Sequence, residues 1–353
     1  MNINGTGLVF NRGKGVNSLR EALDDGWKPP NPPGNGPVPV YRVPDPVMKD
    51  NRTARKMRRA DRFCRLAVAA AGDALDDTGL DMNTFNNAGI LLAAPMGPHA
   101  TTFQFLDDIL DYGDANVSPT LFSNSVHNAA ASYISSAFDI RGPTLTVTLF
   151  HFAFHQALLL AEAWLEEGRC DYVLVGSVDE SAIVYEHIFH RKIALPDDGK
   201  IRPFLFSSSP SAVPGEGCVF FVVSRTNIKT SSCMISLSRR EPAETETDLH
   251  VLDADGLAAD ESAYLDSVSS KVPVASYYPI WGSMFSGSAF SCAVGAVILQ
   301  DRTLYPSPVT DNPHSINLAT AEGSSAINSV LCTRYDCCGH KSSILLRTPR
   351  HQR

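Results

Sequence analysis

The sequence lacks an excess of basic charge, a long apolar run and any cysteine pair with metal-binding spacing. Of its 353 residues, 30 are lysine or arginine and 38 are aspartate or glutamate, which gives a formal net charge of −8. A general nucleic-acid binder takes its affinity from a basic surface, so we expect no nucleic-acid partner. The 44% hydrophobic and 19% charged residues are typical of a globular chain with one large domain or two ordinary ones.

The lack of a long apolar run and the spacing of the cysteines also indicate where in the cell we expect the protein. No uncharged apolar stretch approaches the ~20 residues that a membrane helix needs. Residues 1–10 lack the basic-then-apolar pattern of a signal peptide. None of the eight cysteines forms a CxxC pair, and Cys337 and Cys338 are adjacent and therefore badly placed to bridge each other. We expect eight reduced thiols in a cytoplasmic protein that does not contact a membrane.

Residue patterning predicts a chain that alternates strands and helices. Its most regular section has a strand at 144–148, an apolar helix at 153–167 and a strand at 172–176, a pattern that implies parallel strands with a right-handed crossover. Residues 29–46 contain eight prolines and are expected to form an extended surface connection. The other predicted strands are 1–10, 88–93, 218–223, 234–237, 272–276 and 342–346, and the other predicted helices are 54–78, 101–112, 126–138 and 288–300.

The second part of the chain repeats this alternation in outline, although no exact sequence repeat is visible. We expect an N-terminal half at 1–217, which includes the proline-rich connection at 29–46, and a C-terminal half at 218–353.

Several motifs resemble those of the β-ketoacyl synthases of fatty-acid and polyketide assembly. The resemblance begins at 118–128, S-P-T-L-F-S-N-S-V-H-N, and continues through R-G-P at 141–143. Further matches are G-R-C-D at 168–171 with V-G-S-V at 175–178, and R-P-F at 202–204 with P-G-E-G at 214–217. Together they span most of the chain. The resemblance implies an α/β thiolase-like fold of two related halves in a five-layered αβαβα arrangement, usually dimeric.

At the positions where that family holds its reacting groups, this sequence departs from it. The cysteine nucleophile of the family falls on His151, and its first histidine falls on Asp255. Its lysine and second histidine fall on Tyr278 and Ser283. Condensation needs an acylated thiolate and two histidines that polarise the malonyl thioester. The resemblance therefore implies a chain with no catalytic residues, no cofactor and no intrinsic activity.

Members of the family without the nucleophile are chain-length factors, the β subunits of type II polyketide ketosynthases. The resemblance implies a heterodimer with a ketosynthase α subunit, and an acyl carrier protein that brings the growing chain to a shared tunnel. The short region between Ser224 and His250 fits a trimmed member, of the kind that serves aryl-polyene or related systems. Two alternatives remain: a decarboxylase-like homologue that makes starter units, and a homodimeric acyl-binding protein.

Two groups of apolar residues are candidates for the substrate tunnel. Phe103, Leu106 and Leu110 share one side of the predicted helix 101–112, where ordinary core packing is an equal alternative. Phe150 and Phe152 flank His151 and, with Phe154, are expected to fill the space that an acyl chain would need.

Two polar groups have a functional and a structural interpretation each. Arg55, Arg58, Arg59 and Arg62 could dock an acidic carrier protein, although a solvated helix face is the simpler interpretation. His151 and His155 have the i, i+4 spacing of a metal pair. Because no third ligand is evident, we favour core histidines over either a metal site or an acid–base pair.

Overall fold

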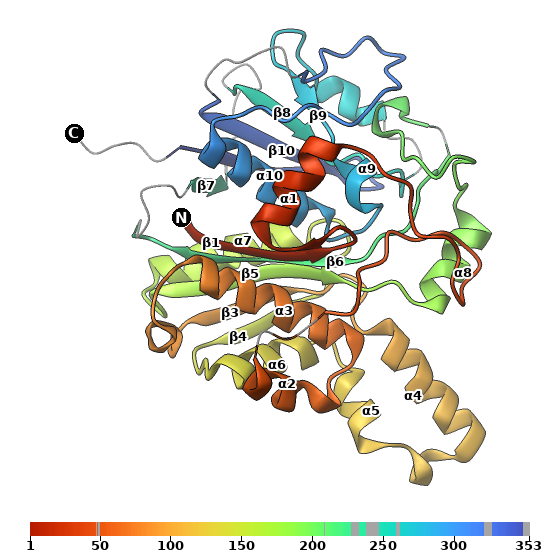
Figure 1. The fold of residues 1–353 in the computed structure, drawn as a ribbon, viewed down its shortest axis with the longest axis vertical. Helices are drawn as coiled ribbons and strands as arrows, with labels where there is room; N and C mark the ends of the chain where they lie inside the picture. Colours follow the sequence, from red (N-terminus) through yellow and green to blue (C-terminus); the bar gives the residue numbers. More distant parts are fainter. Residues whose placement is uncertain are drawn as a thin grey trace.

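Short β-branched and apolar segments assemble into one mixed sheet of eleven strands. The computed structural model describes residues 1–46, 48, 50–207, 209–226, 233–237, 247–258, 262–320 and 327–348, and Figure 1 shows the ribbon. The strands are β1 (Asn2–Phe10), β2 (Gly13–Lys14), β3 (Gly89–Ala93), β4 (Thr144–Val147), β5 (Tyr172–Asp179), β6 (Gly217–Ser224), β7 (Met234–Leu237), β8 (Leu249–Leu252), β9 (Val274–Ala275), β10 (Ser329–Tyr335) and β11 (Lys341–Arg347).

The strand order divides into two sets with the same pairing pattern. The first set runs β4-β3-β5-β6-β1 and the second runs β9-β8-β10-β11-β7. In each set the first three strands are parallel, and the fourth and fifth pair antiparallel with their neighbours. The sets meet where Asn2 of β1 pairs with Met234 of β7. A repeated pairing pattern is therefore present where no sequence repeat was visible.

Helices cover the sheet on both faces and project beyond it. Helix α3 packs on β1, β6 and β5, whereas α7 contacts β3, β5 and β11, and α10 contacts β10, β11 and β6. The hairpin formed by α4 and α5 projects from the body of the molecule (Figure 1). The helices are α1 (Gly15–Asp25), α2 (Asn51–Lys56), α3 (Arg62–Asp77), α4 (His99–Tyr112), α5 (Pro119–Asn124), α6 (Ala129–Phe138), α7 (Ala153–Glu166), α8 (Ile183–Lys192), α9 (Tyr278–Trp281) and α10 (Gly287–Asp301).

Glycines in the first strand allow α3 to approach the sheet closely. A Cβ added at Gly7 would overlap the backbone of Ala74, and one at Gly5 would overlap the same turn of the helix. Ten of the sixteen residues of α3 are buried against the strands and α6. The close contact explains why two glycines are tolerated in a buried strand despite their entropic cost.

The long helix predicted at 54–78 is wrong as a single element. Asp50 begins α2 by accepting a hydrogen bond from the Thr53 amide at 2.8 Å. Ala60 then adopts an extended conformation, and Asp61 begins α3 by accepting from the Cys64 amide at 2.9 Å. Two aspartate caps therefore divide one basic stretch into two helices. The helix predicted at 126–138 also begins later, at Ala129, after the separate α5.

The β-α-β unit β4-α7-β5 is confirmed, as are the strands predicted at 1–10, 88–93, 218–223, 234–237 and 342–346 within a few residues. The strand predicted at 272–276 shrinks to β9, and α1, α8, β8 and β10 are elements that patterning missed. The proline-rich connection is extended, and its Val38 and Val40 pack against Tyr185 and Phe189 of α8.

Two sequence-based expectations concern the whole chain. All eight cysteines are free thiols, of which Cys337 and Cys338 alone are exposed. None of the helices in the described part of the chain has the length and apolar character needed to cross a bilayer. Most of the stretch between Ser224 and His250 lies outside the described residues.

Candidate active site

The candidate site lies where the chain passes from β4 into α7. Residues 148–152 make this junction, and His151 stands two residues before α7 begins at Ala153. Its side chain is partly buried. The ring packs edge-on against Phe285 with centroids 5.2 Å apart. A side chain at a strand-to-helix junction can be held in a position to react. Whether His151 can act as a nucleophile or a base therefore depends on the groups that it contacts.

A buried arginine from β10 binds the side chains that gather here. Arg334 is 1% exposed. Its Nη2 donates to Asp255 Oδ2 at 2.6 Å and lies 3.2 Å from His151 Nδ1. Its Nη1 donates to the Tyr278 hydroxyl at 2.7 Å. A guanidinium has only donors to offer, so three groups from three separate segments point acceptor atoms at one cation.

This arrangement fixes the protonation of His151. Because Arg334 can only donate, Nδ1 of His151 must be the unprotonated nitrogen of the neutral ring. Burial, and secondly the positive charge of Arg334, lower the pKa of His151 to about 4. The ring therefore remains neutral near pH 7, and the lone pair that a nucleophile or base would use is already engaged with the guanidinium.

Further polar groups surround the Arg334–Asp255 pair. The Ser283 hydroxyl donates to the backbone carbonyl of Asp255 at 2.5 Å, and both residues are buried. Burial raises the pKa of Asp253 to about 6 and that of Asp179 to about 7, although Arg334 opposes both shifts. Asp253 accepts a hydrogen bond from Ser291, and Asp179 accepts from the Ser286 amide at 2.7 Å. The centre of the site is thus a buried ionic and hydrogen-bonded cluster.

The structure brings together all four positions that sequence reasoning singled out. His151, Asp255 and Tyr278 bind Arg334 directly, and Ser283 binds the backbone of Asp255. Sequence reasoning missed Arg334 itself. A single arginine within the otherwise apolar segment V-L-C-T-R-Y was the available signal, because a buried arginine requires an anionic partner.

Comparison with known proteins identifies the fold around this site. Residues 35–228, more than half of the chain, match the family model described as the N-terminal domain of beta-ketoacyl synthases. The chain belongs to the beta-ketoacyl synthase family. The four positions at which sequence reasoning expects the reacting groups of this family hold His151, Asp255, Tyr278 and Ser283.

Curated relatives of the beta-ketoacyl synthase family match only part of this chain. The 3-oxoacyl-[acyl-carrier-protein] synthase 2 of Staphylococcus aureus is 26% identical over 221 residues, which cover 60% of this chain and 52% of that protein. The chain spans about half or less of the length of the curated relatives it matches.

Solved structures of the family match this chain over nearly its whole length. A beta-ketoacyl synthase from Burkholderia phymatum superposes with a TM-score of 0.81 at 16% identity and covers 99% of both chains. The ishigamide ketosynthase/chain length factor superposes with a TM-score of 0.79 at 17% identity and covers 98% of both. At such identities the likeness shows the ketosynthase-like α/β fold.

The phenylalanines near this ketosynthase-like site are arranged differently from expectation. Phe150 is 56% exposed and packs on Phe285 at 5.4 Å, while Phe152 is partly buried. Phe154 lies in the core against Phe221 at 5.8 Å. Phe285, which sequence reasoning did not single out, is the aromatic neighbour of His151.

His155 does not form a ligand pair with His151. It is fully buried in α7, where its ring stands edge-on to Phe152 at 5.8 Å. Neither of its ring nitrogens has a hydrogen-bond partner among the described residues. Burial lowers the pKa of His155 to about 3. Because His151 precedes the helix and binds Arg334, the two rings do not share a helix face.

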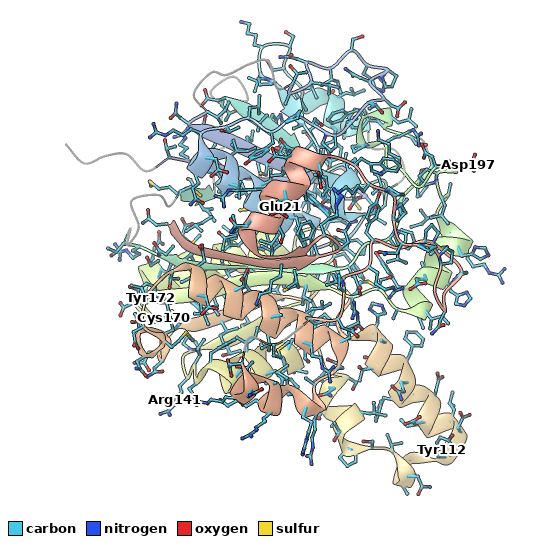
Figure 2. All side chains as sticks on the ribbon, viewed as in Figure 1. Glu21, Tyr112, Arg141, Cys170, Tyr172 and Asp197 are labelled. Carbon is cyan, nitrogen blue, oxygen red and sulfur yellow. The ribbon has the colours of Figure 1, made fainter. Side chains whose placement is uncertain are left out.

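The three residues predicted on the face of helix 101–112 are at the surface of the isolated chain. Phe103 is 43% exposed, Leu106 46% and Leu110 82%. Ordinary core packing within this chain is therefore excluded for them. Tyr112 at the end of the same helix points outward (Figure 2). The exposed side of α4 therefore carries large apolar side chains.

The four arginines proposed for carrier docking separate into two kinds. Arg55, Arg58 and Arg59 are exposed. Arg62 is partly buried and donates from Nη2 to the buried carboxylate of Glu216 at 2.5 Å. That carboxylate also accepts the backbone amides of Val43 and Ser181. Arg62 therefore anchors α3 to the loop before β6, while the other three remain available at the surface.

A substitution of Arg334 tests the electrostatic account of His151. In Arg334→Met, we expect the pKa of His151 to rise above about 4, but to stay below its ordinary value of 6.5 because the ring remains buried. A histidine whose folded pKa is depressed stabilises the fold above pH 6.5, and that contribution is lost as the pH falls towards 4. Because the variant raises the folded pKa, this loss of stability should become smaller and should end at a higher pH. NMR titration of the histidine ring carbons measures the pKa.

The same variant leaves Asp255 buried without its cation, which should cost about 3–5 kcal/mol of stability. The exposed Arg169, paired with exposed Glu167, supplies the control, since Arg169→Met should cost at most about 1 kcal/mol. If Arg334→Met fails to fold, the double variant Arg334→Met/Asp255→Leu removes both charges and should restore the fold. An unchanged His151 pKa in either folded variant would contradict the account.

Proposed function

We propose that this chain is a non-catalytic subunit of the chain-length-factor kind, which pairs with an active ketosynthase in a type II polyketide synthase. The observation that supports the proposal is the position of Arg334. Its guanidinium binds His151, Asp255 and Tyr278, the positions at which the family holds its nucleophile, a histidine and a lysine. Because His151, Asp255 and Tyr278 are bound to Arg334, these three side chains are not free to hold an acyl thioester or to stabilise an enolate.

The alternative of a starter-unit decarboxylase is less well supported. Decarboxylation by ketosynthase relatives depends on donors that stabilise the enolate as carbon dioxide leaves. Here Asp255 is bound to Arg334, and Ser283 donates to the backbone of Asp255. Neither residue presents a free donor to a substrate.

The partner is inferred from an unpaired strand and the apolar residues near it. β4 lies at the end of the sheet and pairs only with β3 among the described strands. An edge with exposed apolar side chains can pair with another chain. Ten large apolar side chains are exposed on α4, α5, β4 and the segments next to them: Phe103, Leu106, Leu110, Tyr112, Phe122, Val126, Leu145, Leu149, Phe150 and Leu159. An active ketosynthase, which shares this fold, is the occupant we propose.

We assign the tunnel to the same region. Phe103, Leu106 and Leu110 of α4 are exposed in the isolated chain, and Phe150 lies beside the blocked site with Phe152 next to it. When a partner covers this face, these side chains would line or close the end of the space in which the growing polyketide lies. The exposed Arg55, Arg58 and Arg59 are the residues we propose for docking an acidic acyl carrier protein.

We also propose that the chain has the five-layered αβαβα arrangement of thiolases, with α7 and α10 in the central layer. Both helices contact strands of the two sets. Because β6 pairs with β5 and β1, we place the division between the halves after Ser224 rather than at 217.

The partner interface is tested with a charge at the sheet edge. We expect Leu145→Lys in β4 to prevent a 1:1 complex with an active partner ketosynthase, because a charged edge residue opposes strand pairing. Leu205→Lys is the matched control, since both leucines are 45% exposed but Leu205 lies outside β4 and α4. Size-exclusion chromatography of co-expressed proteins measures assembly. A soluble wild-type monomer with no affinity for the ketosynthase would contradict the proposal.

The tunnel is tested by product length. Phe103→Ala and Leu106→Ala should lengthen the polyketide made by the reconstituted complex, because each truncation removes side-chain volume from the end of the tunnel. Mass spectrometry of the products measures chain length. Leu110→Ala, at the more exposed end of the helix, should have the smallest effect. Unchanged products from all three well-assembled complexes would remove α4 from the tunnel.

The proposal that His151 takes no part in catalysis is tested by measuring condensation by the complex. His151→Ala should leave condensation by the assembled complex close to wild type, and His151→Cys should not make this chain a ketosynthase. The new thiol would lack histidines at 255 and 283, and each missing electrostatic donor typically costs about 10²–10³ in rate. Turnover of labelled malonyl carrier protein is the measurement. A collapse of activity in His151→Ala with the complex intact would give His151 a chemical role.

A further inference from the structure

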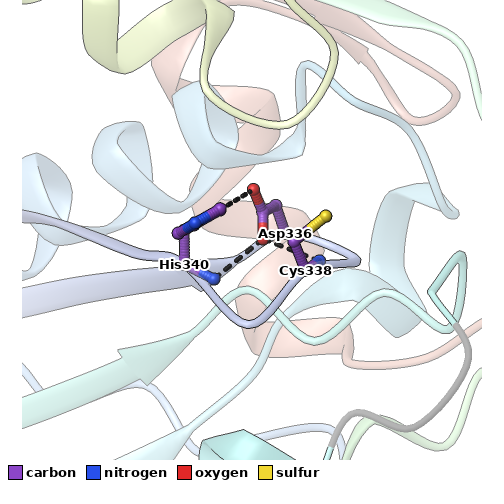
Figure 3. Close-up of side chains that lie close together, drawn as sticks. All are labelled: Asp336, Cys338 and His340. Atoms are coloured by element: carbon purple, nitrogen blue, oxygen red, sulfur yellow. Dashed lines mark hydrogen bonds and ion pairs between the residues drawn. The ribbon is translucent and has the colours of Figure 1, made fainter.

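The hairpin turn between β10 and β11 carries three side chains of the kinds that bind metal ions. Asp336, Cys338 and His340 each offer one ligand atom, and these atoms all lie within 4.8 Å of one another. Figure 3 shows the three side chains on the same short turn. Within the described residues this is the only group of three or more histidine, cysteine, aspartate or glutamate side chains so arranged. The turn plays no part in the proposed function.

Hydrogen bonds donated by backbone amides hold the turn together without a metal ion. Asp336 Oδ1 accepts the amides of Cys338 and His340, each at 2.8 Å. The Asp336 amide donates to the His340 carbonyl at 3.0 Å. Gly339 supplies the positive φ of 78° that reverses the chain. The carboxylate is therefore oriented by its Oδ1, which leaves Oδ2 facing the imidazole, 2.9 Å from His340 Nδ1.

The chemistry of the donors selects a class of metal. A thiolate, an imidazole and a carboxylate suit Zn²⁺, which is bound by sulfur, nitrogen and oxygen ligands in tetrahedral geometry. The hard cations Mg²⁺ and Ca²⁺ prefer oxygen ligands throughout. Access also favours binding, because Cys338 is exposed whereas six of the eight cysteines are buried. The His340 side chain is likewise exposed.

We propose that Asp336, Cys338 and His340 bind one Zn²⁺ ion, with water as the fourth ligand. On binding, the Cys338 thiol releases its proton to solvent, and the ion takes the place of the contact between Asp336 Oδ2 and His340 Nδ1. The amides on Oδ1 stay in place and orient the carboxylate, as outer-shell partners do in metal sites. The earlier expectation of no metal rested on the absence of CxxC spacing and of a third ligand near His151, and neither point concerns this turn.

The bound ion would tie the two ends of the turn together close to the buried cluster. Asp336 is two residues from Arg334 on the same strand end. The site would therefore lock the β10–β11 hairpin that presents the arginine.

Cobalt titration of the full-length chain tests the proposal. Co²⁺ occupies zinc sites and reports a thiolate ligand by a charge-transfer absorption band. We expect this band to saturate at one equivalent of Co²⁺ and to disappear when Zn²⁺ is added. Cys338→Ser should abolish the band. His340→Ala should weaken binding by at least the roughly 10–100-fold that changes in the outer shell cost.

Cys337→Ser is the matched control, since it removes the adjacent exposed thiol and leaves the three ligands intact. It should keep both the band and the affinity. The substituted side chains, Cys337, Cys338 and His340, are exposed on this turn. Circular dichroism should therefore show an unchanged fold in each variant. The proposal is overturned if the wild type gives no band, if Cys338→Ser or His340→Ala binds like the wild type, or if Cys337→Ser loses binding equally.

Discussion

The guanidinium of Arg334 is buried where water cannot screen its charge, and the fold around it is constrained by that fact. Removing such a cation and a carboxylate from water costs several kcal/mol for each ion, and only close pairing with well-placed hydrogen bonds offsets the cost. Asp255 supplies the opposite charge, and Tyr278 and His151 supply further acceptors for Nη1 and Nη2. The end of β10, the loop after β8, the start of α9 and the β4–α7 junction must therefore meet in one geometry.

A buried ion pair at this place has a further meaning in a ketosynthase-like fold. Loss of the nucleophile alone would leave an open site, into which water or a thioester could enter. In this chain the positions at which we expect the reacting groups are instead linked to each other through Arg334, and Phe285 packs edge-on against the ring of His151. Around the edge strand β4 and α4, by contrast, large apolar side chains remain exposed. The side chains that bind Arg334 are occupied inside the molecule while apolar side chains remain exposed outside, and both features support the proposed role of a subunit that acts by association.

Sequence reasoning reached the parts of this structure that local pattern determines. The strand and helix of β4-α7-β5 follow from one apolar run after another, and the four altered site positions follow from motif spacing. Patterning failed where a single side chain determines where a helix begins. Asp61, for example, caps a new helix within a basic stretch. Patterning could not identify Arg334 as the centre of the site, because its partner Asp255 lies 79 residues away.

The position of β1 has a consequence for how the chain is made. This strand is buried along its whole length, yet it pairs with β6 and β7, so that Asn2 lies beside Ser224 and Met234. At a synthesis rate of about 5–20 residues per second, β1 emerges from the ribosome roughly 10–45 s before its partners exist. During that interval β1 can pair only with the short β2 and pack against α1 and α3, while most of both its edges stays open. The central strand of the finished sheet is thus completed only after more than half of the chain has been made, when β6 and β7 supply its neighbours.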